Sequence, residues 1–489
     1  MKKRELMRSA AIGMVFALTG SMLAGCAGGG KEAESPKTEK AETKTEETKA
    51  GEAKETKTAG KEETGKEGED SQKTENAEKD TAQEAGADKE NKDSGEPVMI
   101  TMWGWNAGDI EKIFEAYKEK TGANVTLDYV TVQQEEAFQK LQTTISAGLE
   151  LPDIVPSEVN QRGTMLSLDI WEDLSAEPYN FDTKQIFDYQ IPLCSNEKGE
   201  LCALPWDIST AGLAYKRDLA KEYLGTDDPD EISAMFSTWE EFLEKGVEVK
   251  EASGGKVFMF ASLTNVKQIM DGQNPQPIVK DGTLDMTSVK ETLSWMIKFR
   301  DAGIVDNILE ASTAYSASYA DKLHIFYPCA GWTPNYVIQP NDPDGRGNWG
   351  LAIPPQGCFS WGGSAFMIPR DAKNKDAAYA FIQWMNTEEG TRTQRDVVNY
   401  NTSNTDAYKD PEFAALYDEW FGGQNIGELL FNTAMENIQV RPVSTYDATI
   451  MEVWSMVTEA VNSDSGIDFD GACKMFEDEV YTLAPELKK

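Results

Sequence analysis

The fold of this chain is set by the stretch that begins at residue 98, which reads Val-Met-Ile-Thr-Met-Trp over residues 98–103. A short apolar run bounded by turn residues predicts a buried β-strand. Apolar side chains then recur at helical spacing from Ile110 to Tyr117, and Gly122 marks the end of that predicted helix. A strand followed at once by an amphipathic helix is the repeating unit of an α/β fold.

The same alternation continues along the chain. Residues 125–130 form a second predicted strand, Phe138, Leu141 and Ile145 line a second helix, and residues 154–155 begin a third strand. This regular alternation of strands and helices predicts an open parallel sheet with helices on both faces. The 392 residues that follow position 97 are enough for two domains.

The N-terminus has the pattern of an export signal. Basic residues within positions 2–8 precede a short apolar core at positions 10–18, and residues 23–26 read Leu-Ala-Gly-Cys. That tetrapeptide resembles the bacterial lipobox, which implies a lipoprotein signal peptide over residues 1–25, cleavage before Cys26 and diacylglycerol on the Cys26 sulfur. The alternative is an ordinary cleaved signal with an unrelated cysteine.

The next segment, residues 26–97, is predicted to be a disordered tether behind the lipidated cysteine. From residue 27 to residue 97 it contains no Val, Ile, Leu, Met, Phe, Trp or Tyr, so it has no apolar surface to bury. Acyl chains on Cys26 would then hold the protein at the extracellular face of the cell membrane. A long tether is typical of a Gram-positive surface, and an anchored periplasmic protein is the alternative.

The charge excludes several function classes. The chain carries 47 basic and 84 acidic residues, of which 30 and 62 fall from residue 98 onward, a charge of −32 in that part. A surface this acidic repels phosphate backbones, so we expect no nucleic-acid partner. The single histidine, His324, lies in an apolar stretch and is predicted to be a packing residue. It cannot by itself build a zinc site of several histidines.

Neither a metal nor a cofactor is expected. Residues 342–345 read Asp-Pro-Asp-Gly, but the ligand spacing of a calcium loop is missing, so a turn is predicted. No two cysteines are separated by only two residues, which argues against a metal or redox pair. Cys194 and Cys202 flank a predicted turn, so a disulfide between them is one alternative and two free thiols are the other.

Six motifs occur in the order found in bacterial extracellular solute-binding proteins of ABC sugar importers, a family in which maltose-binding protein is a distant relative. The resemblance covers residues 100 to about 460, and it departs from the usual residues at Lys216-Arg217 and at Cys202. The motifs that resemble the family are Ser146–Val155 with its Pro-Asp-Ile, Gly199–Asp207, Gly212–Leu219, Thr238–Phe242 (Thr-Trp-Glu-Glu-Phe), Gly331-Trp332, and Trp361-Gly362-Gly363 with Ile368-Pro369 and Lys373–Ala378.

The resemblance implies an α/β, two-lobe fold like that of periplasmic binding proteins, with hinge crossings and a ligand cleft between the lobes. It places the solute-binding domain at residues 98–489. The first lobe would hold about 98–209 and 351–369, and the second about 212–348 and 371–489. By analogy, the crossings would lie near Ile208–Gly212, Gly347–Gly350 and Pro369–Arg370.

Sugars present apolar ring faces and hydroxyl edges, which aromatic and planar polar side chains match. Candidate ligand-binding residues follow predicted strands, where open α/β sheets bind ligands, or match positions that the resemblance places in the cleft. Trp206 and Asp207 are neighbours on the strand that enters the first crossing. Because successive side chains of a strand point to opposite faces, only one of the two is expected to contact the ligand. The full candidate set is Trp105, Asn106, Glu158, Asn160, Trp206, Asp207, Trp332, Trp361 and Arg441.

The resemblance predicts a monomeric receptor that captures a carbohydrate, expected to be an oligosaccharide, by lobe closure and delivers it to an ABC permease, with no catalytic residue. Alternatives are the same role for a polyamine or a glycerol phosphate ester, a secreted glycosidase that uses paired carboxylates, and a protein that only adheres to polysaccharide.

Overall fold

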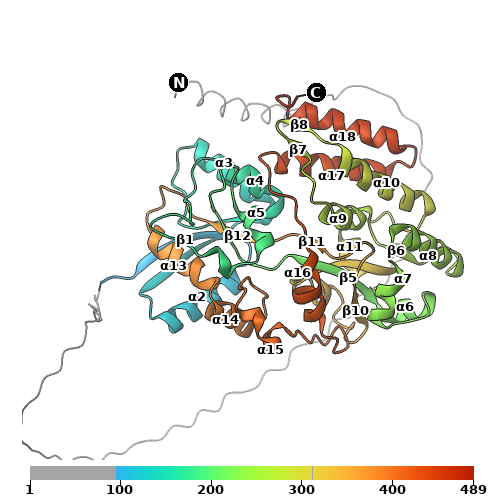
Figure 1. The fold of residues 1–489 in the computed structure, drawn as a ribbon, viewed down its shortest axis with the longest axis horizontal. Helices are drawn as coiled ribbons and strands as arrows, with labels where there is room; N and C mark the ends of the chain where they lie inside the picture. Colours follow the sequence, from blue (N-terminus) through green and yellow to red (C-terminus); the bar gives the residue numbers. More distant parts are fainter. Residues whose placement is uncertain (1–94, 311, 489) are drawn as a thin grey trace, which may run out of the picture. The chain divides into compact units, whose positions relative to one another are not determined.

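Two groups of β-strands, each covered by helices, divide the described residues into two lobes (Figure 1). The computed structural model describes residues 95–310 and 312–488, so the predicted signal peptide, Cys26 and the tether up to residue 94 lie outside it. Within the described part, none of the helices is long and apolar enough to cross a membrane. The predicted two-lobe α/β fold class is confirmed.

The first lobe is built on the stretch that opens the domain. β1 (Val98–Gly104) pairs in parallel with β2 (Val125–Thr131), and Met102 of β1 bridges Ile154 just before β3. Next to this pair lies a three-stranded sheet in which β12 (Ser364–Met367) runs antiparallel to both β3 (Val155–Glu158) and β4 (Leu204–Pro205). The strands of the first lobe are therefore not wholly parallel as predicted. The reason is that β12 enters from the second lobe and not through a crossover helix.

The remaining elements of the first lobe cover this sheet. Their apolar faces meet in one core, which contains Ile100, Phe114 and Leu141. The elements are α2 (Ala107–Thr121), η1 (Gln134–Glu136), α3 (Ala137–Ser146), β3 (Val155–Glu158), α4 (Val159–Leu166), η2 (Thr183–Gln185), η3 (Asp188–Gln190), α5 (Ile191–Cys194), β4 (Leu204–Pro205), β12 (Ser364–Met367), α13 (Lys375–Met385) and α14 (Glu388–Val398).

The second lobe is built around β5 (Thr210–Lys216), every residue of which is buried. The strand order is β10 (Trp349–Ala352), β5, β9 (His324–Ala330) and β6 (Phe258–Phe260), with β11 (Phe359–Ser360) beside β5. Side chains alternate along β5, so Leu213 and Tyr215 enter one core and Ala214 enters another on the opposite face. The strands are β6 (Phe258–Phe260), β9 (His324–Ala330), β10 (Trp349–Ala352) and β11 (Phe359–Ser360), with a separate hairpin of β7 (Val279–Lys280) and β8 (Thr283–Leu284).

Helices of the second lobe come from widely separated segments of the chain. Among them, α10 (Thr287–Ala302), α17 (Asp447–Ser463) and α18 (Phe469–Leu483) lie together in Figure 1. The helices are α6 (Arg217–Tyr223), α7 (Pro229–Met235), α8 (Trp239–Ala252), α9 (Leu263–Gln273), α10 (Thr287–Ala302), α11 (Thr313–Ser318), η4 (Pro334–Ile338), α12 (Gln339–Asn341), η5 (Ala407–Lys409), α15 (Pro411–Ala414), η6 (Glu428–Thr433), α16 (Ala434–Asn437), α17 (Asp447–Ser463) and α18 (Phe469–Leu483).

The predicted lobe boundaries differ from the structure. Residues from 371 onward were expected in the second lobe, but Phe381 of α13 and neighbouring side chains pack in the first-lobe core with β1 and α2. Conversely, residues 351 and 352 begin the segment expected to return to the first lobe, yet they end β10 (Trp349–Ala352), which pairs with β5 in the second lobe. An apolar stripe shows that a helix is buried, but it does not show against which core.

Three connections join the lobes among the described residues: the first at 206–209, the second at 361–363 and the third at 399–406. The predicted crossing at Gly347–Gly350 is wrong, because Gly350 pairs with Tyr215 inside the second lobe. The predicted crossing at Pro369–Arg370 is also wrong, because the Arg370 N–H donates to Ile170 O inside the first lobe (2.7 Å). Glycine and proline at these positions mark turns within a lobe.

The turn between Cys194 and Cys202 brings their backbones together without a disulfide. The Cys202 N–H donates to Cys194 O (3.0 Å), while both thiols are buried and free. Burial raises the pKa of the Cys202 thiol to about 12. Both side chains therefore act as neutral packing groups at this turn.

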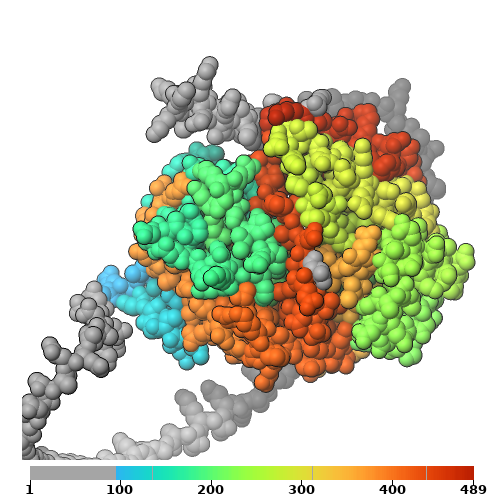
Figure 2. Space-filling view, in the orientation of Figure 1, coloured from blue at the N-terminus to red at the C-terminus, as the bar shows by residue number. Residues whose placement is uncertain are grey.

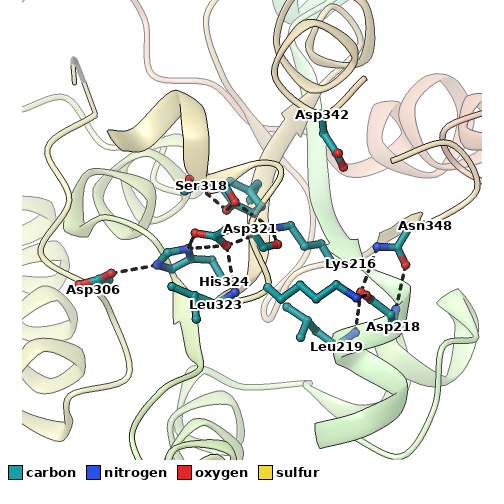
Figure 3. Close-up of polar contacts among 12 residues, drawn as sticks. Lys216, Asp218, Leu219, Asp306, Ser318, Asp321, Leu323, His324, Asp342 and Asn348 are labelled. Atoms are coloured by element: carbon teal, nitrogen blue, oxygen red, sulfur yellow. Dashed lines mark hydrogen bonds and ion pairs between the residues drawn. The ribbon is translucent and has the colours of Figure 1, made fainter. Parts of the chain in front are cut away.

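Lys216, one of the departures from the family's usual residues, is buried at the end of β5 (Figure 3). Its Nζ donates to Ser318 O (2.8 Å) and to Asp321 O (2.5 Å), and it lies 3.3 Å from Asp321 Oδ1. These contacts fasten β5 to the loop that leads into β9. They satisfy a cation that would otherwise be costly to bury.

His324, at the start of β9, is fully buried between two carboxylates (Figure 3). Its Nε2 lies 3.0 Å from Asp306 Oδ2, and its Nδ1 lies 3.0 Å from Asp321 Oδ2. Burial alone would lower the pKa of His324, but the hydrogen bonds to Asp306 and Asp321 raise it above the ordinary value. The predicted packing residue is therefore also a charge bridge between two loops of the second lobe.

We predict that His324→Gln destabilises the protein more at pH 5.5 than at pH 9. A raised folded pKa gives stability that is fully present below the unfolded value of about 6.5 and is lost as pH rises through the folded value. The expected loss at pH 5.5 is on the order of 1–3 kcal/mol. Thermal unfolding of both proteins at the two pH values measures it, and an equal loss at both would contradict the charge bridge.

Candidate functional site

Two tryptophans meet where the lobes join. Trp332 follows β9 in the second lobe, Trp361 begins the second connection, and their ring centroids lie 4.7 Å apart with the planes at 46°. Both rings are half-buried, and Trp332 packs against the cores of both lobes. Half-buried aromatic rings at such a junction supply flat apolar faces that a ligand can cover.

Gly362 and Gly363 allow this approach. Their φ angles are +71° and +116°, in the left-handed region that side chains with a Cβ rarely adopt. A Cβ on Gly362 would lie 3.5 Å from Trp332, and the Gly363 carbonyl accepts the Val159 N–H (3.1 Å). The glycine pair therefore joins Trp332 to the start of α4, where two other candidates lie.

Glu158 ends β3 and caps α4. Its Oε2 accepts the backbone N–H of Asn160 (2.7 Å), which satisfies one of the free donors at the helix N-terminus. Glu158 is buried, whereas Asn160 is exposed. Burial raises the pKa of Glu158 to about 7, although the Asn160 N–H and Arg162 act in the opposite direction. In its protonated form this carboxyl can donate as well as accept a hydrogen bond.

Asn106 starts α2 and takes part in a contact between the lobes. Its Nδ2 donates to Asp109 Oδ2 (3.1 Å) and to the Tyr336 hydroxyl (3.3 Å), and that hydroxyl donates to Asp109 Oδ2 (2.5 Å). Tyr336 belongs to η4 of the second lobe. Sequence reasoning missed Asp109 and Tyr336, although Tyr336 lies one helical turn after Trp332 and that spacing was available as a signal. Trp105, beside Asn106, is half-buried against the first-lobe core.

Trp206 lies in the first-lobe core. Its side chain is only 3% exposed, its indole N–H donates to Gln394 Oε1 (3.0 Å), and its ring packs against Phe366 and Tyr400. Asp207, the next residue, points elsewhere: its two oxygens accept the Ser364 N–H (2.6 Å) and the Tyr400 hydroxyl (2.9 Å). The structure thus gives these two candidates structural partners.

Arg441 is bound to the end of α9. Its Nη2 donates to Asp271 Oδ1 (2.8 Å) and its Nε donates to Gln276 O (2.8 Å). Burial alone would raise the pKa of Asp271, but Arg441 and Lys267 hold it well below its ordinary value. The segment after α16, which carries Arg441, runs between the lobes in Figure 2, and Val443 packs against the first-lobe core.

The described residues contain no group of three or more His, Cys, Asp and Glu side chains placed to hold a metal ion. The side chains that gather at the junction are aromatic rings, amides and carboxyls. Such a set can bind the faces and hydroxyl edges of a small polar molecule. These side chains are therefore the candidate binding site.

Comparison with known proteins supports this class. A family model described as bacterial extracellular solute-binding protein matches residues 112–417, more than half of the chain. A lactose-binding protein from Rhizobium radiobacter is 24% identical over 414 residues, covering 78% of this chain and 92% of the relative. This chain belongs to the bacterial extracellular solute-binding proteins.

Solved structures show the same fold. An extracellular solute-binding protein of family 1 superposes with a TM-score of 0.71 at 21% identity, covering 79% of this chain and all (100%) of the other. A binding protein associated with an ABC transporter of B. animalis subsp. lactis, in complex with β-1,6-galactobiose, has a TM-score of 0.65 at 17% identity. That match covers 80% of this chain and 98% of the other.

We predict that Glu158 makes stability fall as pH rises. A folded pKa of about 7, above the ordinary 4.5, means that the folded protein keeps a proton that the unfolded chain releases, so this contribution is lost as pH rises through 7. Glu158→Gln removes the titration and should flatten the change in melting temperature between pH 5 and pH 8, by the equivalent of about 2–3 kcal/mol. If the melting temperatures of the two proteins changed equally with pH, the raised pKa of Glu158 would be contradicted.

Proposed function

We propose that this protein is the carbohydrate-binding receptor of an ABC importer. The observation that carries the proposal is the Trp332–Trp361 pair at the junction of the lobes, joined through Gly362 and Gly363 to the start of α4. Aromatic faces beside polar edges match a sugar ring. The relative that binds lactose and the structural neighbour in complex with β-1,6-galactobiose support a sugar as the ligand.

In this proposal, each lobe contributes part of the site. Trp332 and Trp361 stack on ring faces, and Glu158 and Asn160 bind hydroxyl groups from the start of α4. Trp105 and Asn106 contribute from the end of β1, a position where α/β sheets bind ligands. Trp206, Asp207 and Arg441 support the site through their contacts within the protein.

Closure of the lobes reports occupancy. A ligand that contacts both lobes binds the closed arrangement more tightly than the open one and therefore shifts the population toward it. The permease subunits then distinguish the loaded receptor from the empty one. No covalent step is needed for this role. The same receptor role for a solute that is not a sugar is the alternative, and the tryptophan pair favours the sugar.

Cys26 and the tether give the receptor its location. A lipid anchor at Cys26 would keep the domain at the extracellular face of the membrane, and the segment up to residue 97 would let it reach the permease. A monomer is sufficient, because both halves of the site come from one chain.

Trp332→Ala should weaken sugar binding by about 2–4 kcal/mol, because the stacking contact and the burial of a ring face are both lost. A thermal-shift screen with lactose, maltose and β-1,6-galactobiose first selects the sugar, and calorimetric titration then compares the two proteins. Trp420→Ala is the matched control, since Trp420 is also half-buried but packs against another core cluster of the second lobe. Unchanged sugar affinity in Trp332→Ala would mean that the Trp332 ring does not contact the sugar.

Cys26→Ala should release the protein from the membrane fraction without changing its sugar affinity. The substitution removes the only sulfur in the lipobox-like sequence, and the long tether separates this position from the lobes. Fractionation of cells that express each form measures the release. Full membrane retention of the variant would contradict lipid anchoring at Cys26.

A further inference from the structure

The three connections between the lobes converge on one carboxylate. Asp207 lies in the first connection and is 4% exposed. Its Oδ1 accepts the N–H of Ser364, where the second connection enters β12 (2.6 Å). Its Oδ2 accepts the hydroxyl of Tyr400, in the third connection (2.9 Å). A single side chain therefore bonds to two chain segments that are more than 150 residues away in sequence.

Backbone contacts hold the same three segments side by side. The Ile208 N–H donates to Asn401 O (3.1 Å), which ties the first connection to the third. The Trp361 N–H donates to Ser209 O (2.9 Å), which ties the first to the second. The Asp207 carboxylate therefore adds side-chain hydrogen bonds to three segments that backbone hydrogen bonds already hold next to one another.

The surroundings of Asp207 leave no room for a sugar. The hollow beside it measures about 10 Å³, and Arg162, Gln190 and Ser209 are among the residues that line it. That volume is about what one water molecule requires. Burying a carboxylate is costly, so its retention here needs partners that offset the cost, and Ser364 and Tyr400 supply them.

We propose that Asp207 is a positioning residue that fastens the three connections to one another, so that they bend as a single hinge. Gly362 and Gly363 give the second connection the backbone freedom to bend, and Asp207 fixes where that bend begins. Without the carboxylate, each connection would move on its own. The two halves of the site would then meet in more than one orientation. This role concerns the joint between the lobes and holds whatever solute they enclose.

Hydrogen–deuterium exchange of the full-length, ligand-free protein tests the proposal. In Asp207→Ala, amides in all three connections (206–210, 361–365 and 400–404) should exchange at least tenfold faster than in the wild type. Because the readout needs no ligand, its failure would leave the proposed sugar specificity untouched. Acceleration confined to residues 206–210 would overturn the proposal.

Asp153→Ala is the matched control. Asp153 is also a buried aspartate, 2% exposed, and it accepts the N–H groups of Thr101 (2.9 Å) and Asn374 (2.8 Å) inside the first lobe. Its loss should speed exchange around those residues and leave the three connections protected. If both variants loosen the connections equally, the effect is general destabilisation of the lobe and the hinge role is wrong.

Tyr400→Phe keeps the test decisive if Asp207→Ala does not fold. It removes the hydroxyl and leaves the ring, which packs edge-on against Tyr336 (centroids 5.5 Å apart). Exchange should then rise in the first and third connections, while the Ser364 amide stays protected by Asp207. Interlobe distances measured by single-molecule fluorescence should broaden in the same variant. Unchanged exchange and distances in Tyr400→Phe would overturn the proposal.

Discussion

The close approach of three chain segments at the junction of the lobes is the constraint on which the rest of the structure depends. Each lobe has its own core, and these segments carry the chain from one lobe to the other. Contacts such as Asn106 with Tyr336 and α4 with α17 add to the junction between the lobes. Gly362 and Gly363 permit the approach because they adopt positive φ angles. The same pair places Trp361 beside Trp332, so the joint and the binding surface are parts of one arrangement.

Buried carboxyls give this junction its electrostatic character. Burial raises the pKa of Glu158 and of Asp207, and it raises the pKa of Asp447, at the start of α17, to about 7. Asp447 accepts the Ser444 N–H (2.9 Å), close to Gly163 of α4. α4 therefore has Glu158 at its start and the second lobe along its side. For a receptor outside the cell, external pH would act on this region directly.

The sequence predicted features that depend on neighbouring residues better than features that depend on contacts between distant segments. The strands and helices from residue 98 to residue 155 follow from periodicity, which is local, and the structure has them where they were predicted. The crossing expected near Ile208–Gly212 overlaps the first connection. The other two connections did not follow, because Gly347 and Pro369 have the same turn chemistry inside a lobe as at its boundary. Gly362-Gly363 was named only as part of a family motif, and its place in the second connection needed the fold.

The side chains show the same limit. Alternation along a strand said that Trp206 and Asp207 point apart, but not which partners each would find. The partner of Arg441 is Asp271, far away in sequence, and no local pattern reveals such a pair. Trp332 and Trp361 were named from the family resemblance, but their mutual contact needed the fold. Sequence motifs thus identified candidate residues, but the partners of those residues depend on tertiary packing.

A crystal structure of the domain with the sugar that most raises its melting temperature is the most direct measurement. The account predicts a sugar ring stacked on Trp332, with the Glu158 carboxyl within hydrogen-bond distance of a hydroxyl and both lobes in contact with the ligand. A sugar bound to one lobe only, away from the Trp332–Trp361 pair, would contradict it.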